Sequence, residues 1–166
     1  IKLAESGKMR KFEKISARQQ FKQMLISLQA TSHPWLTWKD TTNVRALNNN
    51  TGTIHLSNLC TEITLPQDND HIAVCNLVSI NLTAHLNEDG TWDWDRLASS
   101  SRSAIRQLDN LVDITSLPVP EAMRANTQTR ALGLGMMGFT DALERLKLSY
   151  DSEQAFELID QLTEHI

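Results

Sequence analysis

Residues 72–82, with the sequence Ile-Ala-Val-Cys-Asn-Leu-Val-Ser-Ile-Asn-Leu, decide the fold class of this chain. Valine, isoleucine and leucine dominate this stretch, and runs of this composition favour a β-strand. A second β-like stretch covers residues 53–65, and a polar turn at residues 66–70 separates the two. The sequence therefore predicts strands in the middle of the chain.

Helical patterns flank the predicted strands. Ser16 and Gln19 match a capping box, in which each side chain bonds the other's free backbone N–H, and the helix that they open is expected to stop before Pro34. A long helix is expected over residues 92–115 and another across residues 139–146. The predicted buried side of the long helix consists of Leu97, Ala104, Leu108, Leu111 and Val112.

A last helix is expected to open at Asp151, with Gln154 at its third position. Its predicted buried residues are Ala155, Leu158, Ile159 and Leu162. Residues 40–53, which are rich in asparagine, are expected to form a loop. The combination of helices with central strands predicts a mixed α/β fold.

The size and composition are those of a globular domain. The chain has 166 residues, and one domain takes roughly 100–200 residues. Its hydrophobic content of 40% and charged content of 22% exclude a disordered or fibrous protein. No apolar run approaches the ~20 residues of a membrane helix, and two cysteines are too few for a secreted disulfide scaffold. With no signal peptide at its start, we expect a soluble, cytoplasmic protein that does not bind membranes.

The charge pattern gives no indication of a nucleic-acid partner. The formal net charge is −4, whereas nucleic-acid binding is typical of a basic surface. The one short basic cluster is interpreted as a solvated helix flank, and it consists of Lys8, Arg10, Lys11 and Lys14.

The candidate chemistry lies at residues 57–63, Ser-Asn-Leu-Cys-Thr-Glu-Ile. In an extended chain side chains alternate between faces, and neighbours on one face are about 6.5–7 Å apart. Asn58, Cys60 and Glu62 would then share a face, presenting an amide, a thiol and a carboxyl group in a row. This arrangement suits a small polar substrate such as a sugar ring.

The residues between them are expected to point the other way, so that Leu59 and Ile63 anchor the segment in a core. The same alternation is typical of any half-buried strand, and a lone cysteine is commonly a small buried hydrophobic residue. The pattern alone therefore leaves both interpretations open.

Cys75 is the second thiol, and by itself it is typical of a buried strand position. A zinc site formed by His55, Cys60, His71 and Cys75 is an alternative. These four residues lack the close cysteine pairs that are typical of structural zinc.

Residues 133–138, Gly-Leu-Gly-Met-Met-Gly, match the pattern G-x-G-x-x-G. A dinucleotide site requires a hydrophobic strand directly before such a motif, and residues 125–130 do not supply one. We interpret these glycines as small residues that let a helix pack closely, and expect no nicotinamide cofactor.

Taken together, these motifs resemble the large (alpha) subunit of ribonucleotide reductase. The resemblance is carried by residues 57–63 and by residues 74–82, which contain the second cysteine. Further matching stretches lie in the family's order at residues 14–18, 34–40 and 130–139. The resemblance covers nearly the whole chain.

The resemblance implies a ten-stranded α/β barrel in which a finger loop carries Cys60 into the centre. Residues 1–166 would be an internal part of one catalytic barrel domain, incomplete at both ends. Because these residues cannot close the barrel and would leave strand edges exposed, we expect the isolated segment to be inactive and poorly stable.

The resemblance also implies a role for each candidate residue. Cys60 would become a thiyl radical that abstracts the 3′ hydrogen of the ribonucleotide, and Glu62 would take the proton of the 3′ hydroxyl. Asn58 would hydrogen-bond the ribose hydroxyls, with Ser57 also in the substrate site. Cys75 would be one half of a redox pair that reduces the 2′ carbon and ends as a disulfide with a cysteine outside this chain.

The implied enzyme is an allosteric, nucleotide-binding oxidoreductase that converts ribonucleoside diphosphates to the deoxyribonucleotides needed for DNA replication. Leu59 and Thr61, beside the cysteine, resemble the class I pattern, in which a separate metal-containing small (beta) subunit supplies the radical. Adenosylcobalamin is the alternative radical source. We expect no cofactor or metal bound in this segment, thioredoxin or glutaredoxin as reductant, and a homodimer.

Two other kinds of protein are considered beside this enzyme. One is a non-catalytic α/β domain built around the Cys/His zinc site. The other is a degenerate, partner-binding paralogue, which is disfavoured because Asn58, Cys60, Glu62 and Cys75 are all retained.

Overall fold

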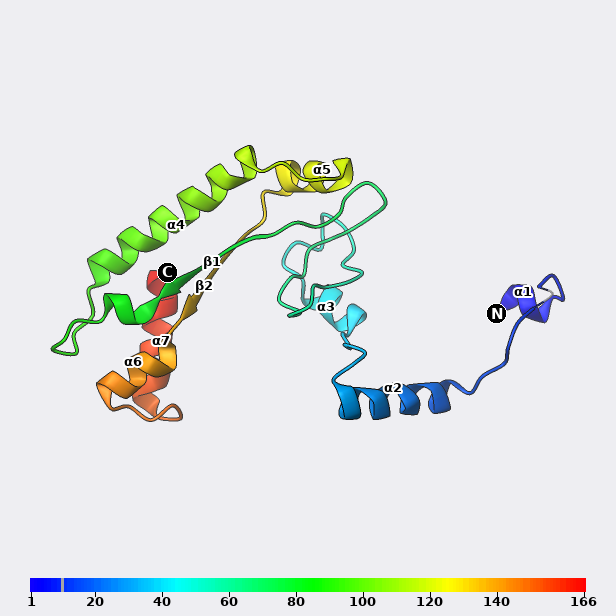
Figure 1. The fold of residues 1–166 in the computed structure, drawn as a ribbon, viewed down its shortest axis with the longest axis horizontal. Helices are drawn as coiled ribbons and strands as arrows, with labels where there is room; N and C mark the ends of the chain where they lie inside the picture. The colour runs from blue at the N-terminus through cyan, green and yellow to red at the C-terminus, as the bar shows by residue number, and fades with distance from the viewer. Residues whose placement is uncertain (10) are drawn as a thin grey trace. The chain divides into compact units, whose positions relative to one another are not determined.

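The computed structural model describes residues 1–9 and 11–166. Arg10, one member of the basic cluster, lies outside the described residues. The chain forms two compact units (Figure 1): residues 1–46 with 56–64, and residues 47–55 with 65–166.

The described residues of the first unit form three helices, α1 (Lys2–Glu5), α2 (Ala17–Thr31) and α3 (Lys39–Arg45). One half of the capping box predicted for α2 is confirmed, since the Ser16 side chain accepts a hydrogen bond from the Gln19 backbone N–H at 3.4 Å. Helix α3 covers the first part of the stretch 40–53 that was expected to be a loop, so that prediction is wrong for residues 40–45, whereas residues 46–53 do form neither helix nor strand. The polar side chains of Thr42 and Asn43 bond back to carbonyls of the same turn, which keeps them within the helix.

The second unit contains a two-stranded parallel sheet. Strand β1 (Asn76–Asn81) pairs with β2 (Leu132–Met137), with Asn76 opposite Leu132 and Asn81 opposite Met137. Parallel strands need a long crossover connection. Here the short helix η1 (Leu82–His85) is followed by the crossover helices α4 (Trp94–Ile114) and α5 (Pro120–Thr129).

Two more helices, α6 (Phe139–Leu146) and α7 (Glu153–His165), follow β2 and complete the second unit. The start of α7 differs by one residue from the prediction, because Ser152 rather than Asp151 accepts the capping hydrogen bond, from the Ala155 N–H at 3.2 Å. Pro120 follows the long helix α4. It is also the first residue of α5, a position where its missing N–H has no cost.

The sheet has two different faces, because side chains alternate along each strand. Val78 and Ile80 of β1 and Leu134 and Met136 of β2 pack against the hydrophobic core, and we call this side the core face. The other side, here called the open face, carries Leu77, which is 56% exposed, together with the exposed residues Ser79 and Gly135.

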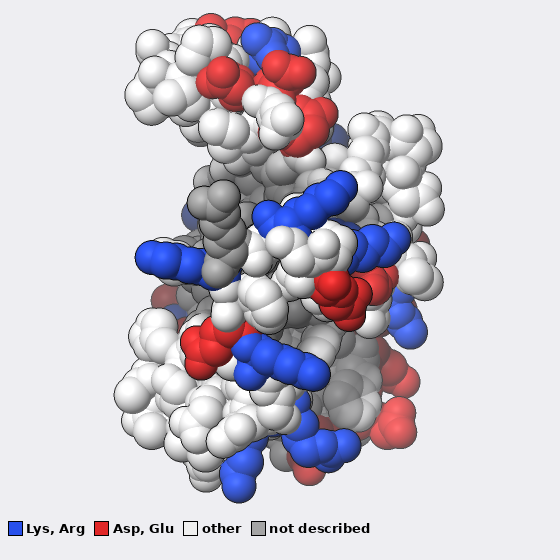
Figure 2. All heavy atoms as spheres, turned by 90° about the vertical axis from the view of Figure 1, so that its right-hand side faces the viewer, with Lys and Arg blue, Asp and Glu red and all other residues white. Residues whose placement is uncertain are grey.

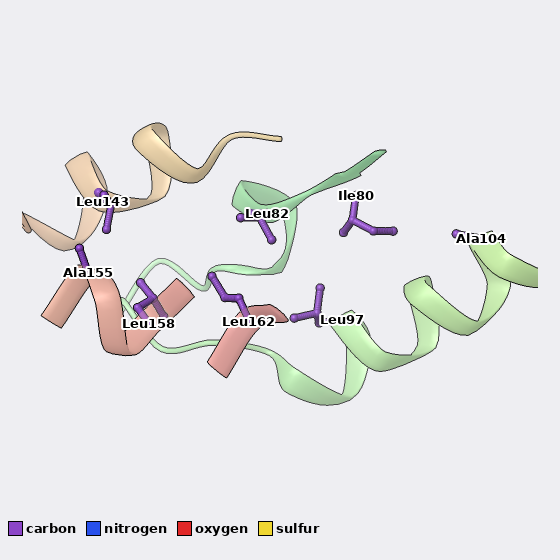
Figure 3. Close-up of a cluster of buried hydrophobic side chains, with 8 residues drawn as sticks. All are labelled: Ile80, Leu82, Leu97, Ala104, Leu143, Ala155, Leu158 and Leu162. Atoms are coloured by element: carbon purple, nitrogen blue, oxygen red, sulfur yellow. The ribbon is translucent and has the colours of Figure 1, made fainter. Parts of the chain in front are cut away.

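The core is formed by side chains from five elements, β1, η1, α4, α6 and α7 (Figure 3). Its buried members are Ile80, Leu82, Leu97, Ala104, Leu143, Ala155, Leu158 and Leu162. Most of the buried positions predicted for α4 and α7 are confirmed. Two are wrong, because Leu111 is 40% exposed and Ile159 is only partly buried.

Only part of the predicted strand content is present. A strand does form within residues 72–82, but it covers only Asn76–Asn81. Residues 53–65 form no strand. Instead of a ladder, Gln67 contacts this stretch through local hydrogen bonds: its N–H donates to the Thr53 carbonyl at 3.1 Å and its side chain accepts from the His55 N–H at 2.9 Å. Since a strand is stable only beside a partner, the apolar pattern was not sufficient here.

The glycine motif belongs to strand β2, so the helix-packing interpretation is wrong. A Cβ placed on Gly133 would collide with the Leu77 side chain and lie 3.5 Å from Cys75 Sγ. Gly138 has a φ of +79° where the strand turns into α6, a conformation that glycine adopts without steric cost. The glycines therefore serve strand pairing and a tight turn.

Charged side chains of both signs are interspersed on the face drawn in Figure 2. The strongest ion-pair cluster is in the second unit, where the Arg130 guanidinium lies 2.7 Å from both Asp109 and Asp113 of α4. Asp113 and then Asp109 raise the pKa of Arg130, and the hydrogen bond from Arg130 lowers the pKa of Asp113.

Within the described residues, none of the helices has the length and apolar character of a membrane span.

The burial difference along α4 gives the first prediction. Leu97→Ala in the full-length protein removes a side chain that is fully buried, and we expect it to lower the free energy of unfolding by about 2–5 kcal/mol. Leu111→Ala is the matched control on the same helix, and its effect should be clearly smaller. Urea unfolding measures both, and equal losses would contradict the assignment of Leu111 to the surface.

Candidate active site

The cysteine predicted to be reactive lies in a turn of the first unit, not in a strand. The Thr61 backbone N–H donates to the Asn58 carbonyl at 3.2 Å, which closes a four-residue β-turn with Cys60 at its third position. Thr61 has a φ of +64°, and a β-branched residue is a real outlier in this left-handed region. The expected alternation of faces at residues 57–63 is therefore wrong.

The turn nevertheless brings the predicted polar residues together. The Asn58 amide N–H donates to Glu62 Oε1 at 2.6 Å, and Asn58 Oδ1 accepts the Ile63 backbone N–H at 3.2 Å. The Ser57 hydroxyl donates to the Ile63 carbonyl at 2.8 Å. The side chains of Asn58 and Glu62 thus meet across the turn that carries Cys60.

The expected apolar anchors behave differently from each other. Leu59 is 89% exposed, so its predicted role as a core anchor is wrong. Ile63 is partly buried. The hydrogen bonds made by Ser57 and Asn58 fix the shape of this segment, because both side chains bond the backbone of Ile63 within it.

The site presents three different functional groups at the surface of its unit. Asn58, Cys60 and Glu62 are all exposed, and Ser57 is partly buried. The carboxylate can accept a proton, the amide can bond a hydroxyl group, and the sulfur lies between them in sequence. A carboxylate and an amide that already share a hydrogen bond are oriented for a polar substrate.

Cys75 belongs to the second unit, directly before β1, and its thiol is partly buried. Its sulfur lies near Gly133, on the side of the sheet where Leu77 also lies. This is the open face, away from α4 and the core. The second cysteine is therefore held at the start of a strand, whereas Cys60 is held in a turn.

The four residues of the zinc alternative do not form a metal site. Across the described residues, no group of three or more His, Cys, Asp and Glu side chains is placed to hold a metal ion. His71 is instead bonded through its two ring nitrogens to Asp68 Oδ1 at 2.9 Å and to Gln128 Oε1 at 3.0 Å.

A cavity of about 710 Å³ in the second unit was not found by sequence reasoning. Its wall includes His55, Gln67, Asp68, His71 and Gln128. The sequence feature that could have indicated this site is the spacing of Asp68 and His71, which are three residues apart. Nothing in the sequence indicated that α5 would supply Gln128 from 57 residues further along.

The hydrogen bonds among His71, Asp68 and Gln128 shift the pKa values of His71 and Asp68. The hydrogen bond from His71 lowers the pKa of Asp68 below its usual 3.8. The hydrogen bonds to Asp68 and then to Gln128 raise the pKa of His71 above its usual 6.5, since a protonated ring can donate to both oxygens. Arg124 opposes this rise through its own positive charge.

These shifts give a pH prediction. The raised pKa of His71 means that its contribution to stability is complete below 6.5 and is lost as the pH rises through the higher folded value. The lowered pKa of Asp68 means that its contribution is complete above 3.8 and is lost in more acidic solution. We therefore expect His71→Gln to destabilise the full-length protein more at about pH 5.5 than at about pH 8.5. Urea unfolding at both pH values tests this, and an equal loss would contradict it.

The parallel strands with their helical crossover place the chain among α/β proteins, and comparison with known proteins identifies the family. The family model of the ribonucleotide reductase barrel domain matches residues 2–166. The chain belongs to the ribonucleotide reductase family and lies within its barrel domain.

Individual relatives agree with this assignment. The ribonucleoside-diphosphate reductase subunit alpha of Chlamydia muridarum is 44% identical over 98% of this chain, and the large subunit of Danio rerio is 35% identical over 92%. Among solved structures, the class Id ribonucleotide reductase alpha subunit of Actinobacillus ureae is similar with a TM-score of 0.69 and 30% identity, over 89% of this chain and 30% of that one. The chain spans 15% and 19% of the length of the first two proteins.

Proposed function

We propose that the whole protein is a ribonucleoside-diphosphate reductase and that residues 1–166 belong to its catalytic barrel domain. The observation that carries this proposal is the turn at residues 58–61, which brings Asn58 and Glu62 into contact at 2.6 Å around Cys60. These are the residues to which the family resemblance assigns the thiyl radical chemistry. The names of the relatives support the same substrate class.

The proposed architecture is a ten-stranded α/β barrel with a finger loop at its centre. The parallel pair β1–β2, with helices of the second unit on its core face, is the kind of unit from which such a barrel is built. The turn that carries Cys60 would be the tip of the finger loop. Cys75, on the open face of the sheet, would then face the interior of the barrel.

The proposed reaction begins at Cys60, whose thiyl radical takes the 3′ hydrogen of the ribonucleotide and leaves a radical on the 3′ carbon. After the reduction, Cys60 returns this hydrogen to the 3′ carbon and its thiyl radical forms again. Glu62 accepts the proton of the 3′ hydroxyl, and Asn58 bonds the ribose hydroxyls, with Ser57 in the same substrate site. Since Asn58 already bonds Glu62, a sugar hydroxyl that enters the site can be shared between the amide and the carboxylate.

The reducing equivalents are proposed to come from Cys75 and a cysteine outside residues 1–166. Their two thiols lose two electrons and two protons and form a disulfide. The 2′ carbon gains hydrogen in place of its hydroxyl, which leaves as water. Thioredoxin or glutaredoxin would restore the two thiols by exchange.

The radical is proposed to come from a separate metal-containing small (beta) subunit, as in class I. Similarity to a class Id alpha subunit supports this over adenosylcobalamin. The full-length protein is proposed to be an allosteric, cytoplasmic homodimer that binds neither nucleic acid nor membranes.

Replacing the proposed radical residue is the direct test of this function. Cys60→Ser in the full-length protein should abolish turnover, because the serine hydroxyl does not form a radical as the cysteine thiol does. The same change should leave nucleotide binding nearly unchanged. Deoxynucleotide formation and equilibrium nucleotide binding measure the two properties. Turnover that survives the substitution would refute the radical role.

Cys75→Ser is the companion variant, and it should also block product formation while keeping substrate affinity.

The role of the carboxylate is tested separately. Glu62→Gln keeps the shape of the side chain and an oxygen that can accept from Asn58, but it removes the base. We expect kcat to fall by about 10²–10⁴-fold, the usual contribution of a general base, with a small change in KM. Glu88→Gln, at a surface turn of the second unit, is the matched control. Equal kcat values for the Glu62 variant and this control would exclude Glu62 as the base.

A further inference from the structure

Two glycines of strand β2, Gly133 and Gly135, lie on the open face of the sheet. Neither has a φ in the left-handed region, so the backbone of β2 does not require glycine at these positions. A glycine within a strand weakens it and often marks a place where another group approaches the backbone closely. The reason for these glycines is therefore to be sought in the side chains that lie above them.

The two glycines differ in what a side chain would meet. Gly133 is paired with Leu77 of β1, and Gly135 is paired with Ser79. A Cβ on Gly133 would collide with the end of the Leu77 side chain, whereas a Cβ on Gly135 would lie 3.6 Å from Ser79 Oγ, an ordinary contact. The space that glycine leaves open at position 133 is thus already filled, by a leucine that lies across β2.

The same space also borders the thiol of Cys75. The Cβ position of Gly133 lies 3.5 Å from Cys75 Sγ and 3.8 Å from Leu77 Cγ. Residues two apart on a strand share a face, and here both side chains lie over Gly133. Since the thiol is only partly buried, the Leu77 side chain is a barrier that a reagent meets when it approaches the sulfur from the side of β2.

We infer that Leu77 shields the Cys75 thiol and that Gly133 is the positioning residue that allows it to do so. Without a side chain at position 133, Leu77 can lie beside the sulfur, and a methyl group there would displace it. The shielding does not require a mobile thiol, because a neighbouring side chain limits approach whatever else the sulfur contacts. The inference rests on the proposed function only for its consequence, which is that a redox-active thiol is protected from small reagents.

The test is a double-mutant cycle in the full-length protein, made of Leu77→Ala, Gly133→Ala and the variant that carries both. Each protein is treated with iodoacetamide in the folded, reduced state, and peptide mass spectrometry gives the alkylation rate of Cys75, which depends on access to the sulfur. We expect Leu77→Ala alone to raise this rate by about twofold or more, the low end for side chains in contact. When Gly133→Ala is already present, adding Leu77→Ala should change the rate little, because Leu77 no longer lies beside the thiol.

Two matched controls come from the same unit. Gly135→Ala is the same substitution on the same strand and face but meets no collision, so Leu77→Ala should keep its full effect when combined with it. Leu111→Ala removes another partly exposed leucine, on α4, which packs on the core face. This second control should leave the rate at Cys75 unchanged.

Two results would overturn the inference. If Leu77→Ala raises the rate at Cys75 no more than Leu111→Ala does, Leu77 does not shield the thiol. If Leu77→Ala has the same effect beside Gly133→Ala as beside Gly135→Ala, Gly133 does not position Leu77. Should Gly133→Ala alone fail to fold, adding Leu77→Ala must restore folding, because it removes the collision, and a double variant that stays unfolded would also contradict the inference.

Alkylation separates this inference from the proposed function. It requires no turnover, so it tests the shielding even if Cys60→Ser remains active and the proposed function fails. Conversely, a protein that Cys60→Ser inactivates, but whose Cys75 reacts no faster after Leu77→Ala, would keep the proposed function and refute the shielding alone.

Discussion

The parallel pairing of β1 with β2 is the constraint on which the second unit depends. Two strands that run in the same direction cannot be joined by a short turn, so the chain must cross from the end of one to the start of the other. Helices α4 and α5 make that crossing, and α4 packs on the core face of both strands. Helices cover this side of the sheet. Cys75, Leu77 and the glycines of β2 lie on the opposite side, because side chains alternate along each strand.

The sequence predicted best what is determined locally. The cap at Ser16 and the apolar stripe of α4 depend on residues within a few positions of each other, and both were found. Residues 53–65 were misjudged because a strand needs a partner that lies elsewhere in the sequence. The glycines at 133 and 135 were misjudged for the same reason, since their role is defined by the side chains of Leu77 and Ser79 on the neighbouring strand.

The identity of the site residues was easier to predict than their geometry. The motif around Cys60 names an amide, a thiol and a carboxyl group whatever their conformation. Whether these three groups lie along a strand or across a turn depends on one unusual backbone angle, the positive φ of Thr61. A threonine rarely adopts this angle, so the residue type argues against it. The hydrogen bond between the side chains of Asn76 and Asn126 could not be predicted either, because 50 residues separate two asparagines that carry no periodic pattern.

The two cysteines are held by different physical means, and the difference fits their proposed roles. A left-handed threonine is costly and persists only where its surroundings fix it. At Thr61 the backbone bond to the Asn58 carbonyl closes the turn, and the side chains of Ser57 and Asn58 bond the backbone of Ile63 just after it. Asn58 therefore has two tasks under the proposed function, since it shapes the turn that carries the radical thiol and bonds the ribose. A substrate hydroxyl that competes for Asn58 would also act on the turn, which couples occupation of the site to the position of Cys60. Cys75 is held differently, since it lies directly before β1, partly buried, with its sulfur near Gly133 of the neighbouring strand.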